Sequence, residues 1–129
     1  IGDKNKIQTF YYEKKHHPMN TLNKKFAKYF WTNQKHIKKK KIMTRTFDYL
    51  IKKMKKVDLL DIDVEGSEYE VIKNINFKKI SFKIILIEHS IFNAVTKKNT
   101  KKIKRLLSKE NYTHIRNFGE TSVYKNKFY

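Results

Sequence analysis

The stretch that decides the fold is VDLLDIDVEGSE, residues 57–68. Residues 57–64 are dense in branched apolar side chains, which indicates a β-strand, and Gly66 ends it. A helix is expected over residues 67–75, and a second strand, nearly all apolar, over residues 82–87. Strand, helix and strand within about 30 residues form a βαβ unit, so the two strands should be parallel with a right-handed crossover.

Outward from this unit, the spacing of apolar residues predicts further short elements. Strands are expected over residues 6–13, 42–45, 112–117 and 122–127, and helices over residues 21–31, 47–54 and 100–110. The last two strands flank Gly119, so we expect them to close the sheet as an antiparallel hairpin. A length of 129 residues predicts a single domain, residues 1–129.

The composition excludes several classes of protein. The chain has no cysteine, which rules out a disulfide framework, a zinc–thiolate site and a thiol nucleophile. No apolar run approaches the ~18 residues that a membrane span needs. The N-terminus is polar and lacks the apolar region of a secretory signal. We therefore expect a cytoplasmic protein without a transmembrane segment.

The charge is large and unevenly distributed. Lys and Arg number 31 against 12 Asp and Glu, a net charge of +19, and the basic residues are almost all Lys. Lys, Asn and Ile are abundant and have A/T-rich codons, so genome composition can explain much of this charge. The alternative is a small basic nucleic-acid-binding module, since Lys-rich surfaces attract phosphate backbones. Half of the carboxylates lie within residues 58–70, a window that contains no basic residue.

Polar side chains follow both strands of the βαβ unit. Asp63 and Glu65 stand at the end of the first strand, and Glu88 and His89 at the end of the second. Because ligands of open α/β sheets bind at the carboxyl ends of strands, these groups could hold a divalent cation or serve as general acid or base. The alternative is structural: acidic residues stabilise the first turn of a helix, and a lone His is commonly a hydrogen-bonded surface residue.

Several nucleotide-binding and catalytic motifs are absent. The glycines are Gly2, Gly66 and Gly119, far apart in the chain, so neither a P-loop nor a G-x-G-x-x-G turn is present. A serine nucleophile elbow is also absent.

Residues 57–68, with VIK at 71–73, strongly resemble the signature of the FkbM family of S-adenosylmethionine-dependent methyltransferases, LLKIDVEGAE followed by VLKG. The flanks are similar too. TFDYL at 46–50 resembles the family's TLDxL element, and ILIEH at 85–89 resembles its next strand, which often ends in Glu. IKRLLSKENY at 103–112 resembles the late helix that ends in LxxxGY.

The resemblance implies an α/β, Rossmann-like class I methyltransferase fold with a mostly parallel sheet, of which this chain holds the C-terminal part. The family's glycine-rich cofactor turn should precede Ile1, so the chain alone is expected to be inactive. The implied reaction transfers a methyl group from S-adenosylmethionine to a hydroxyl of a sugar, lipid or small molecule. An inactive remnant of such an enzyme is a further alternative. Asp61 stands where the family usually has Lys, which changes the local charge.

The resemblance also assigns candidate roles. Asp63 and His89 are the candidate catalytic residues, and Asp63, Glu65 and Gly66 the candidate cofactor-binding residues. Related O-methyltransferases place divalent-metal ligands at the ends of these two strands. By that analogy Asp63, Glu88 and His89 are candidate ligands of a cation such as Mg²⁺ that acidifies the acceptor hydroxyl. The alternative is general-base catalysis by His89 or Asp63 without a metal.

Overall fold

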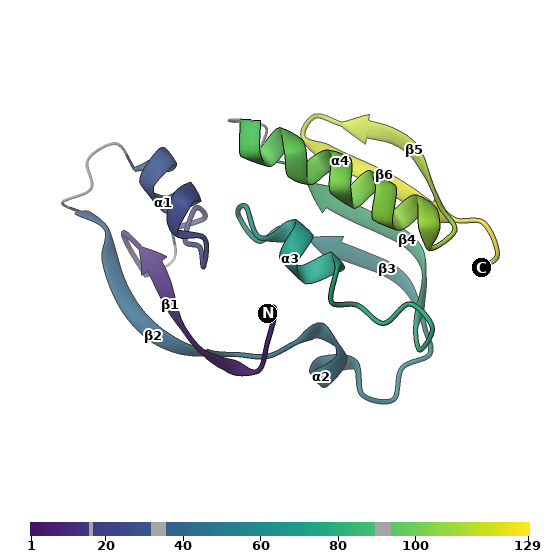
Figure 1. The fold of residues 1–129 in the computed structure, drawn as a ribbon, viewed down its shortest axis with the longest axis horizontal. Helices are drawn as coiled ribbons and strands as arrows, with labels where there is room; N and C mark the ends of the chain where they lie inside the picture. The colour runs from purple at the N-terminus through teal and green to yellow at the C-terminus, as the bar shows by residue number, and fades with distance from the viewer. Residues whose placement is uncertain (16, 32–35, 90–93) are drawn as a thin grey trace.

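The computed structural model describes residues 1–15, 17–31, 36–89 and 94–129. Its elements run along the chain as shown in Figure 1. They are β1 (Lys6–Tyr12), α1 (Lys24–Phe30), β2 (Lys38–Thr44), α2 (Phe47–Ile51), β3 (Lys56–Ile62), α3 (Glu68–Ile72), β4 (Ser81–Glu88), α4 (Ala94–Lys109), β5 (Tyr112–Phe118) and β6 (Thr121–Asn126). The predicted elements are all present, with bounds that shift by up to six residues, the most at the start of α4.

The strands form two sheets. β1 and β2 make an antiparallel ribbon, and the other four strands make a sheet in the order β3-β4-β6-β5. The predicted parallel pairing of β3 with β4 and the predicted hairpin of β5 and β6 are both confirmed. The prediction of a mostly parallel sheet is not confirmed. Among the described strands only β3 and β4 pair in parallel, because the hairpin supplies half of the sheet and docks antiparallel on β4.

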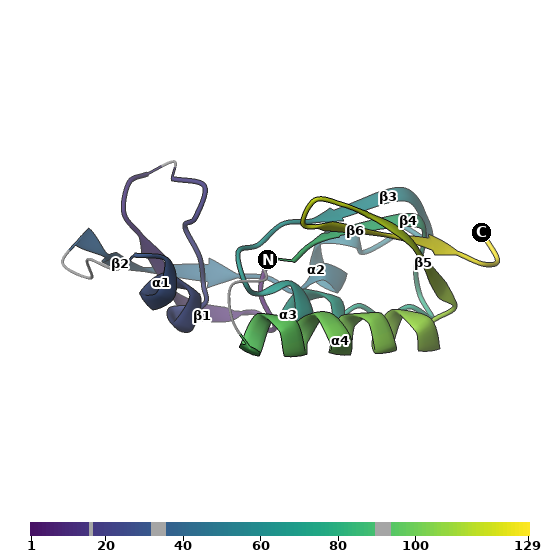
Figure 2. The same cartoon turned by 90° about the horizontal axis from the view of Figure 1, so that it is seen from above.

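α3 and α4 pack on the same face of the four-stranded sheet (Figure 2). Figure 2 shows α3 and α4 side by side beneath the strands. Apolar side chains of β4 and α4 meet between these layers, and Ile85, Ile87 and Leu107 are completely buried there. This packing is the hydrophobic core, and it holds β3 and β4 in the register that pairs Ile62 with Ile87.

α2 is shorter than the sequence predicts. Thr46 caps its first turn through its hydroxyl, as expected from the sequence, and Phe47 is buried. The helix then ends at Ile51, because the amide of Met54 donates to the Ile51 carbonyl in a tight turn (2.7 Å). Leu50 and Met54, which were expected on its apolar face, are more than half exposed.

β2 begins four residues before the predicted strand, inside the run of four lysines at 38–41. Pairing with β1 explains this, because the ladder joins Phe10 to Lys40 and Tyr12 to Lys38. The lysine side chains remain exposed, and the Lys40 ammonium lies over the rings of Phe10 and Tyr12. Backbone pairing with an aromatic strand therefore outweighs the poor strand preference of lysine.

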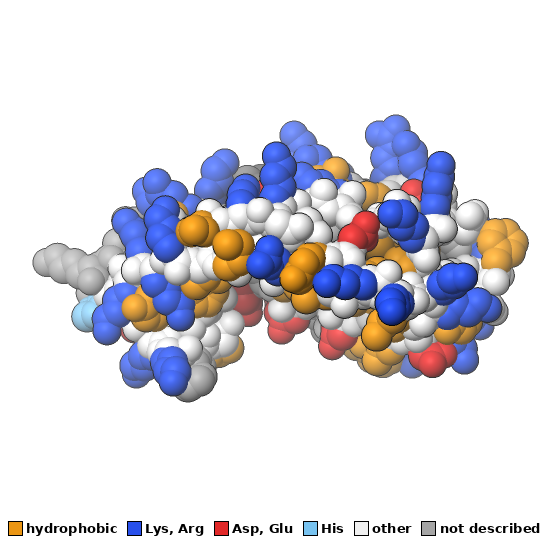
Figure 3. Space-filling view, turned by 90° about the horizontal axis from the view of Figure 1, so that it is seen from below, with side chains coloured by type: hydrophobic (Ala, Val, Ile, Leu, Met, Phe, Trp, Pro, Cys, Tyr) orange, Lys and Arg blue, Asp and Glu red, His pale blue; other side chains and the backbone are white. Residues whose placement is uncertain are grey.

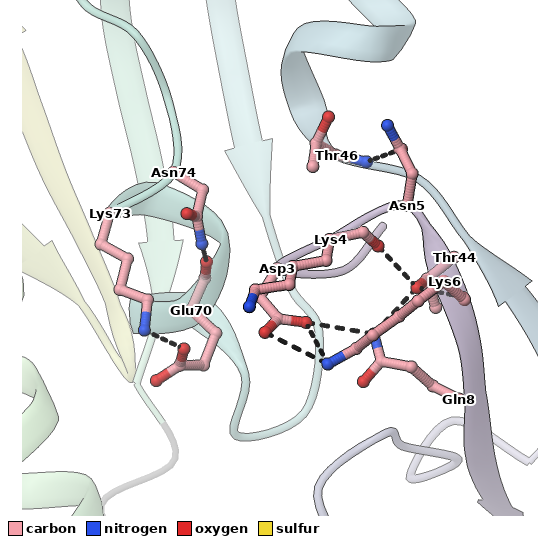
Figure 4. A network of polar contacts seen from close by, with 10 residues as sticks. All are labelled: Asp3, Lys4, Asn5, Lys6, Gln8, Thr44, Thr46, Glu70, Lys73 and Asn74. Carbon is pink, nitrogen blue, oxygen red and sulfur yellow. Dashed lines mark hydrogen bonds and ion pairs between the residues drawn. The ribbon is translucent and has the colours of Figure 1, made fainter.

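A polar network fastens the open end of the ribbon (Figure 4). The Thr44 hydroxyl accepts from the Gln8 amide (2.8 Å) and lies 2.9 Å from the carbonyl oxygens of Lys4 and Lys6. Asn5 accepts from the backbone amide of Thr46 (2.9 Å). These contacts fix where the chain leaves β2 and enters α2. No helix within the described ranges is long and apolar enough to cross a membrane.

Candidate active site at the ends of β3 and β4

The parallel pairing of β3 and β4 brings three carboxylates to one edge of the sheet. Asp63 follows β3 directly, Glu65 lies in the turn after it, and Glu88 is the last residue of β4. One carboxylate oxygen from each of the three lies within 4.8 Å of the others. The predicted convergence of Asp63, Glu65 and Glu88 is therefore present in the structure. We call these three residues the carboxylate cluster.

The turn that presents Glu65 has an unusual backbone. Glu65 has φ +50° and Gly66 has φ +85°, the left-handed region that favours glycine. A Cβ on Gly66 would approach the Phe26 ring to 2.9 Å, so only glycine fits between the turn and α1. The side chain of Glu65 is only 9% exposed, and its Oε2 is buried without a hydrogen-bond partner.

The segment before α1 holds this turn in place. Thr21 donates its hydroxyl hydrogen to the Glu65 carbonyl (2.7 Å), and the Asn23 side-chain amide donates to the Gly66 carbonyl (2.6 Å). The Gly66 amide donates to the Glu68 carboxylate (2.8 Å). These contacts occupy both carbonyls and the Gly66 amide, while the Glu65 carboxylate oxygen Oε2 stays unpaired.

Sequence reasoning missed the contribution of Thr21, Asn23 and Phe26. A weak signal for Asn23 existed, because Asn before an apolar helical run is a typical N-cap. Its side chain does cap α1 by accepting from the amides of Lys25 and Phe26. That it also reaches Gly66, 43 residues later, is a tertiary contact that no local pattern encodes.

Crowding of negative charge alters the titration of the cluster. Burial, followed by the charges of Asp63, Glu68 and Glu120, raises the pKa of Glu65 from 4.5 to about 7. A hydrogen bond with Asp63, followed by burial and the neighbouring carboxylates, raises the pKa of Glu88 from 4.5 to about 7. At neutral pH the carboxyl groups of Glu65 and Glu88 are therefore partly protonated, unless a bound cation neutralises the cluster.

His89 lies at the same sheet edge but outside the carboxylate cluster. Its backbone amide donates to the Glu120 carbonyl (2.8 Å), its ring is buried, and Nε2 has no hydrogen-bond partner. Burial and the neighbouring His114 lower the pKa of His89, so the imidazole is neutral at pH 7. The four candidate side chains thus divide into three carboxylates that meet and one imidazole that does not join them.

The sequence of the chain identifies its family. Residues 1–118 match the model of the methyltransferase FkbM domain. The chain belongs to the FkbM methyltransferase family. No curated protein and no solved structure matches it. The match runs from the start of the chain to the end of β5, so the ribbon, the βαβ unit and the carboxylate cluster all lie within the FkbM domain.

A hollow of about 830 Å³ lies at the other end of the sheet of this FkbM domain. It opens beside α2 and the first residues of β3 and β4, and six lysines line it: Lys52, Lys53, Lys55, Lys56, Lys78 and Lys79. Lys and Arg side chains also spread across the face shown in Figure 3. Because ligands of α/β sheets bind at the carboxyl ends of strands, the carboxylate cluster is the better candidate for chemistry.

Proposed function

We propose that this FkbM domain takes part in an S-adenosylmethionine-dependent O-methyltransferase, acting on a hydroxyl of a small molecule, lipid or glycan. The observation that supports it is the carboxylate cluster, at the ends of two parallel strands in a chain of the methyltransferase family. The proposal includes that the glycine-rich part of the cofactor site lies outside these 129 residues, which hold only three separated glycines.

The residues present fit one end of the cofactor. S-adenosylmethionine, when bound, supplies a methyl group carried on a positively charged sulfur. Carboxylates complement that charge, and the Glu65 carboxylate keeps a buried oxygen without a partner. Because Thr21 and Asn23 already occupy the carbonyls of Glu65 and Gly66, the proposed cofactor contacts run through the side chains of Asp63 and Glu65. Gly66 contributes by permitting the turn to pack against Phe26.

Methyl transfer also needs a base. A bond forms between the acceptor oxygen and the methyl carbon, the carbon–sulfur bond breaks with its electron pair going to sulfur, and the hydroxyl proton leaves. Asp63 is exposed, and one of its carboxylate oxygens lies within 4.8 Å of one of Glu88, so Asp63 is the proposed proton acceptor, with Glu88 positioning it. The neutral imidazole of His89 is the second proposed base.

The test uses the complete reading frame that encodes this chain, labelled S-adenosylmethionine and a panel of hydroxyl acceptors. Transfer of label is expected, and Asp63→Asn should lower kcat by about 10²-fold or more. Asp58→Asn is the matched control, because Asp58 is an exposed carboxylate within β3, the strand that Asp63 follows, and accepts instead from the Tyr129 hydroxyl. Unchanged kcat in Asp63→Asn would remove Asp63 from the mechanism, and no label on any acceptor would contradict the proposed reaction.

Nucleic-acid binding is the second candidate function, favoured by the six lysines around the hollow beside α2. If it holds, the chain binds single-stranded oligonucleotides with an affinity that falls steeply as salt rises. Replacing Lys53, Lys55 and Lys78 by Gln should then weaken binding and reduce the salt slope. Binding that a simple polyanion such as heparin competes away equally would count against a specific role.

A further inference from the structure

We infer that Asp63, Glu65 and Glu88 form a binding site for one hard divalent cation of the Mg²⁺, Mn²⁺ or Ca²⁺ class. Oxygen atoms of the three carboxylates lie within 4.8 Å of one another, a spacing that a single ion can bridge by small side-chain movements. The three ligands come from the end of β3, the turn after it and the end of β4, so the fold itself brings them together.

Glu65 provides an observation that is independent of this clustering. Its side chain is only 9% exposed, and Oε2 is buried with no hydrogen-bond partner, although buried carboxylate oxygens are normally satisfied. A carboxylate oxygen of Glu65 also lies within 4.8 Å of carboxylate oxygens of Asp63 and Glu88. A cation at the cluster supplies the partner that this buried oxygen lacks.

Among the described residues, no basic side chain forms an ion pair with the carboxylate cluster. The ion pairs there join Lys6 to Asp3, His17 to Glu13 and Lys73 to Glu70, and none of them includes a member of the cluster. This is notable in a chain with 31 Lys and Arg residues and a net charge of +19. The cluster is thus kept away from the abundant lysines, as a site for an external cation requires.

The ligand chemistry indicates the class of metal. Three carboxylates are an all-oxygen set, which suits Mg²⁺, Mn²⁺ and Ca²⁺ and is a poor set for Zn²⁺ or Cu²⁺. The chain has no cysteine, and the imidazole of His89, the residue after Glu88, lies outside the cluster. The site therefore uses Glu65 in the position that the sequence-based hypothesis gave to His89.

The backbone around Glu65 is organised before any ion binds. Thr21 and Asn23 hold the carbonyls of the turn, and Phe26 packs against Gly66. A ligand on a fixed turn loses little freedom on binding, which favours affinity. The inference that an ion binds here depends on this geometry alone. A role of the ion in acidifying an acceptor hydroxyl rests on the proposed function as well.

The test titrates Mn²⁺ into the chelator-treated protein encoded by the complete reading frame and follows free Mn²⁺ by electron paramagnetic resonance. One site is expected, with Mg²⁺ and Ca²⁺ as competitors. Glu65→Gln and Glu88→Gln should each weaken binding by about tenfold or more, the scale on which losing a charged ligand acts. Glu70→Gln is the matched control, because Glu70 lies on neighbouring α3 but pairs with Lys73. Circular dichroism checks that each variant is folded.

Absence of saturable binding, or equal affinity in Glu65→Gln, Glu88→Gln and Glu70→Gln, would overturn the inference. If the complete protein transfers methyl groups while Mn²⁺ does not bind, the inference fails and the proposed function stands. If Mn²⁺ binds and no acceptor is methylated, the proposed function fails and the cation site stands. Asp63→Asn provides a further variant should one of the Glu variants not fold.

Discussion

The four-stranded sheet and the β1–β2 ribbon of this FkbM domain are stabilised in different ways. The sheet, with α3 and α4, contains the main hydrophobic core, in which Ile72, Ile85 and Leu107 are completely buried. The ribbon is an antiparallel ladder with exposed lysines, held at its open end by polar contacts such as that between Thr44 and Gln8. Its neighbour α1 buries Phe26 and Ala27 outside the main core.

The two regions meet at the turn of Glu65 and Gly66. Thr21, Asn23 and Phe26 come from the ribbon side of the molecule, and the turn belongs to the βαβ unit. The two regions therefore make different contributions to the site. The sheet brings the carboxylates together, and the segment around α1 fixes the turn that carries Glu65. Four predictions test this difference, from the largest expected effect to the smallest.

Gly66→Ala should destabilise the fold most, by about 3 kcal/mol. Alanine at this position pays two costs. Its backbone is held in the left-handed region, and its Cβ lies 2.9 Å from the Phe26 ring. Gly119→Ala is the matched control, since Gly119 also has positive φ (+54°) but has nothing within 4 Å of its added Cβ. It should cost only about 1 kcal/mol. Urea unfolding of both variants measures this, and equal losses would show that contact with α1 is unimportant.

Glu65→Gln should change how stability depends on pH in metal-free buffer. The raised pKa of Glu65, about 7 against 4.5, means that the folded state binds its proton more tightly than the unfolded chain. Its contribution is full below pH 4.5 and is lost as pH rises through 7. Removing the charge should therefore stabilise the protein at pH 8 by about 2–3 kcal/mol and change little at pH 4.5.

Thermal unfolding with EDTA at the two pH values measures the effect. The proposed cation adds a control, because Mg²⁺ should stabilise the native chain at pH 8 more than it stabilises Glu65→Gln. A Glu65→Gln variant that is less stable than the native chain at pH 8 with EDTA would contradict the assigned charge crowding.

Asn23→Ala should cost about 1–2 kcal/mol, because it removes the cap of α1 and the hydrogen bond to the Gly66 carbonyl. Asn23→Ser separates these roles, since Ser can cap the helix but cannot reach Gly66 with an amide. If the link between the regions matters, Asn23→Ser should still lower stability, by about 1 kcal/mol. Native stability in Asn23→Ser would show that Asn23 acts only within α1.

Lys73→Ala should have the smallest effect, within about 0.5 kcal/mol. Lys73 pairs with Glu70 one turn away on the surface of the βαβ unit, and both side chains are substantially exposed. Such pairs are screened by solvent, so neither region depends on them. Chemical denaturation at low and high salt measures the change, and a loss above 1 kcal/mol would show that surface charge contributes more than this comparison assigns.

The βαβ unit and the placement of the acidic residues at the carboxyl ends of its strands follow from the amino-acid order. Hydrophobic periodicity is local, and parallel strands must end at the same sheet edge, so the amino-acid order alone suffices to place Asp63, Glu65, Glu88 and His89 at one edge of the sheet. The same local signals predicted the β5–β6 hairpin around Gly119, which the structure confirms.

The tertiary structure sets which neighbours those residues have. It put Glu65 inside the carboxylate cluster and left the imidazole of His89 out of it, although both residues are equivalent candidates in the sequence. It also brought Thr21, Asn23 and Phe26 to a turn about 40 residues away along the chain. The physical reason is that side-chain direction and long-range hydrogen bonds depend on packing between elements, whereas strand and helix formation depends mainly on the spacing of apolar residues along the chain.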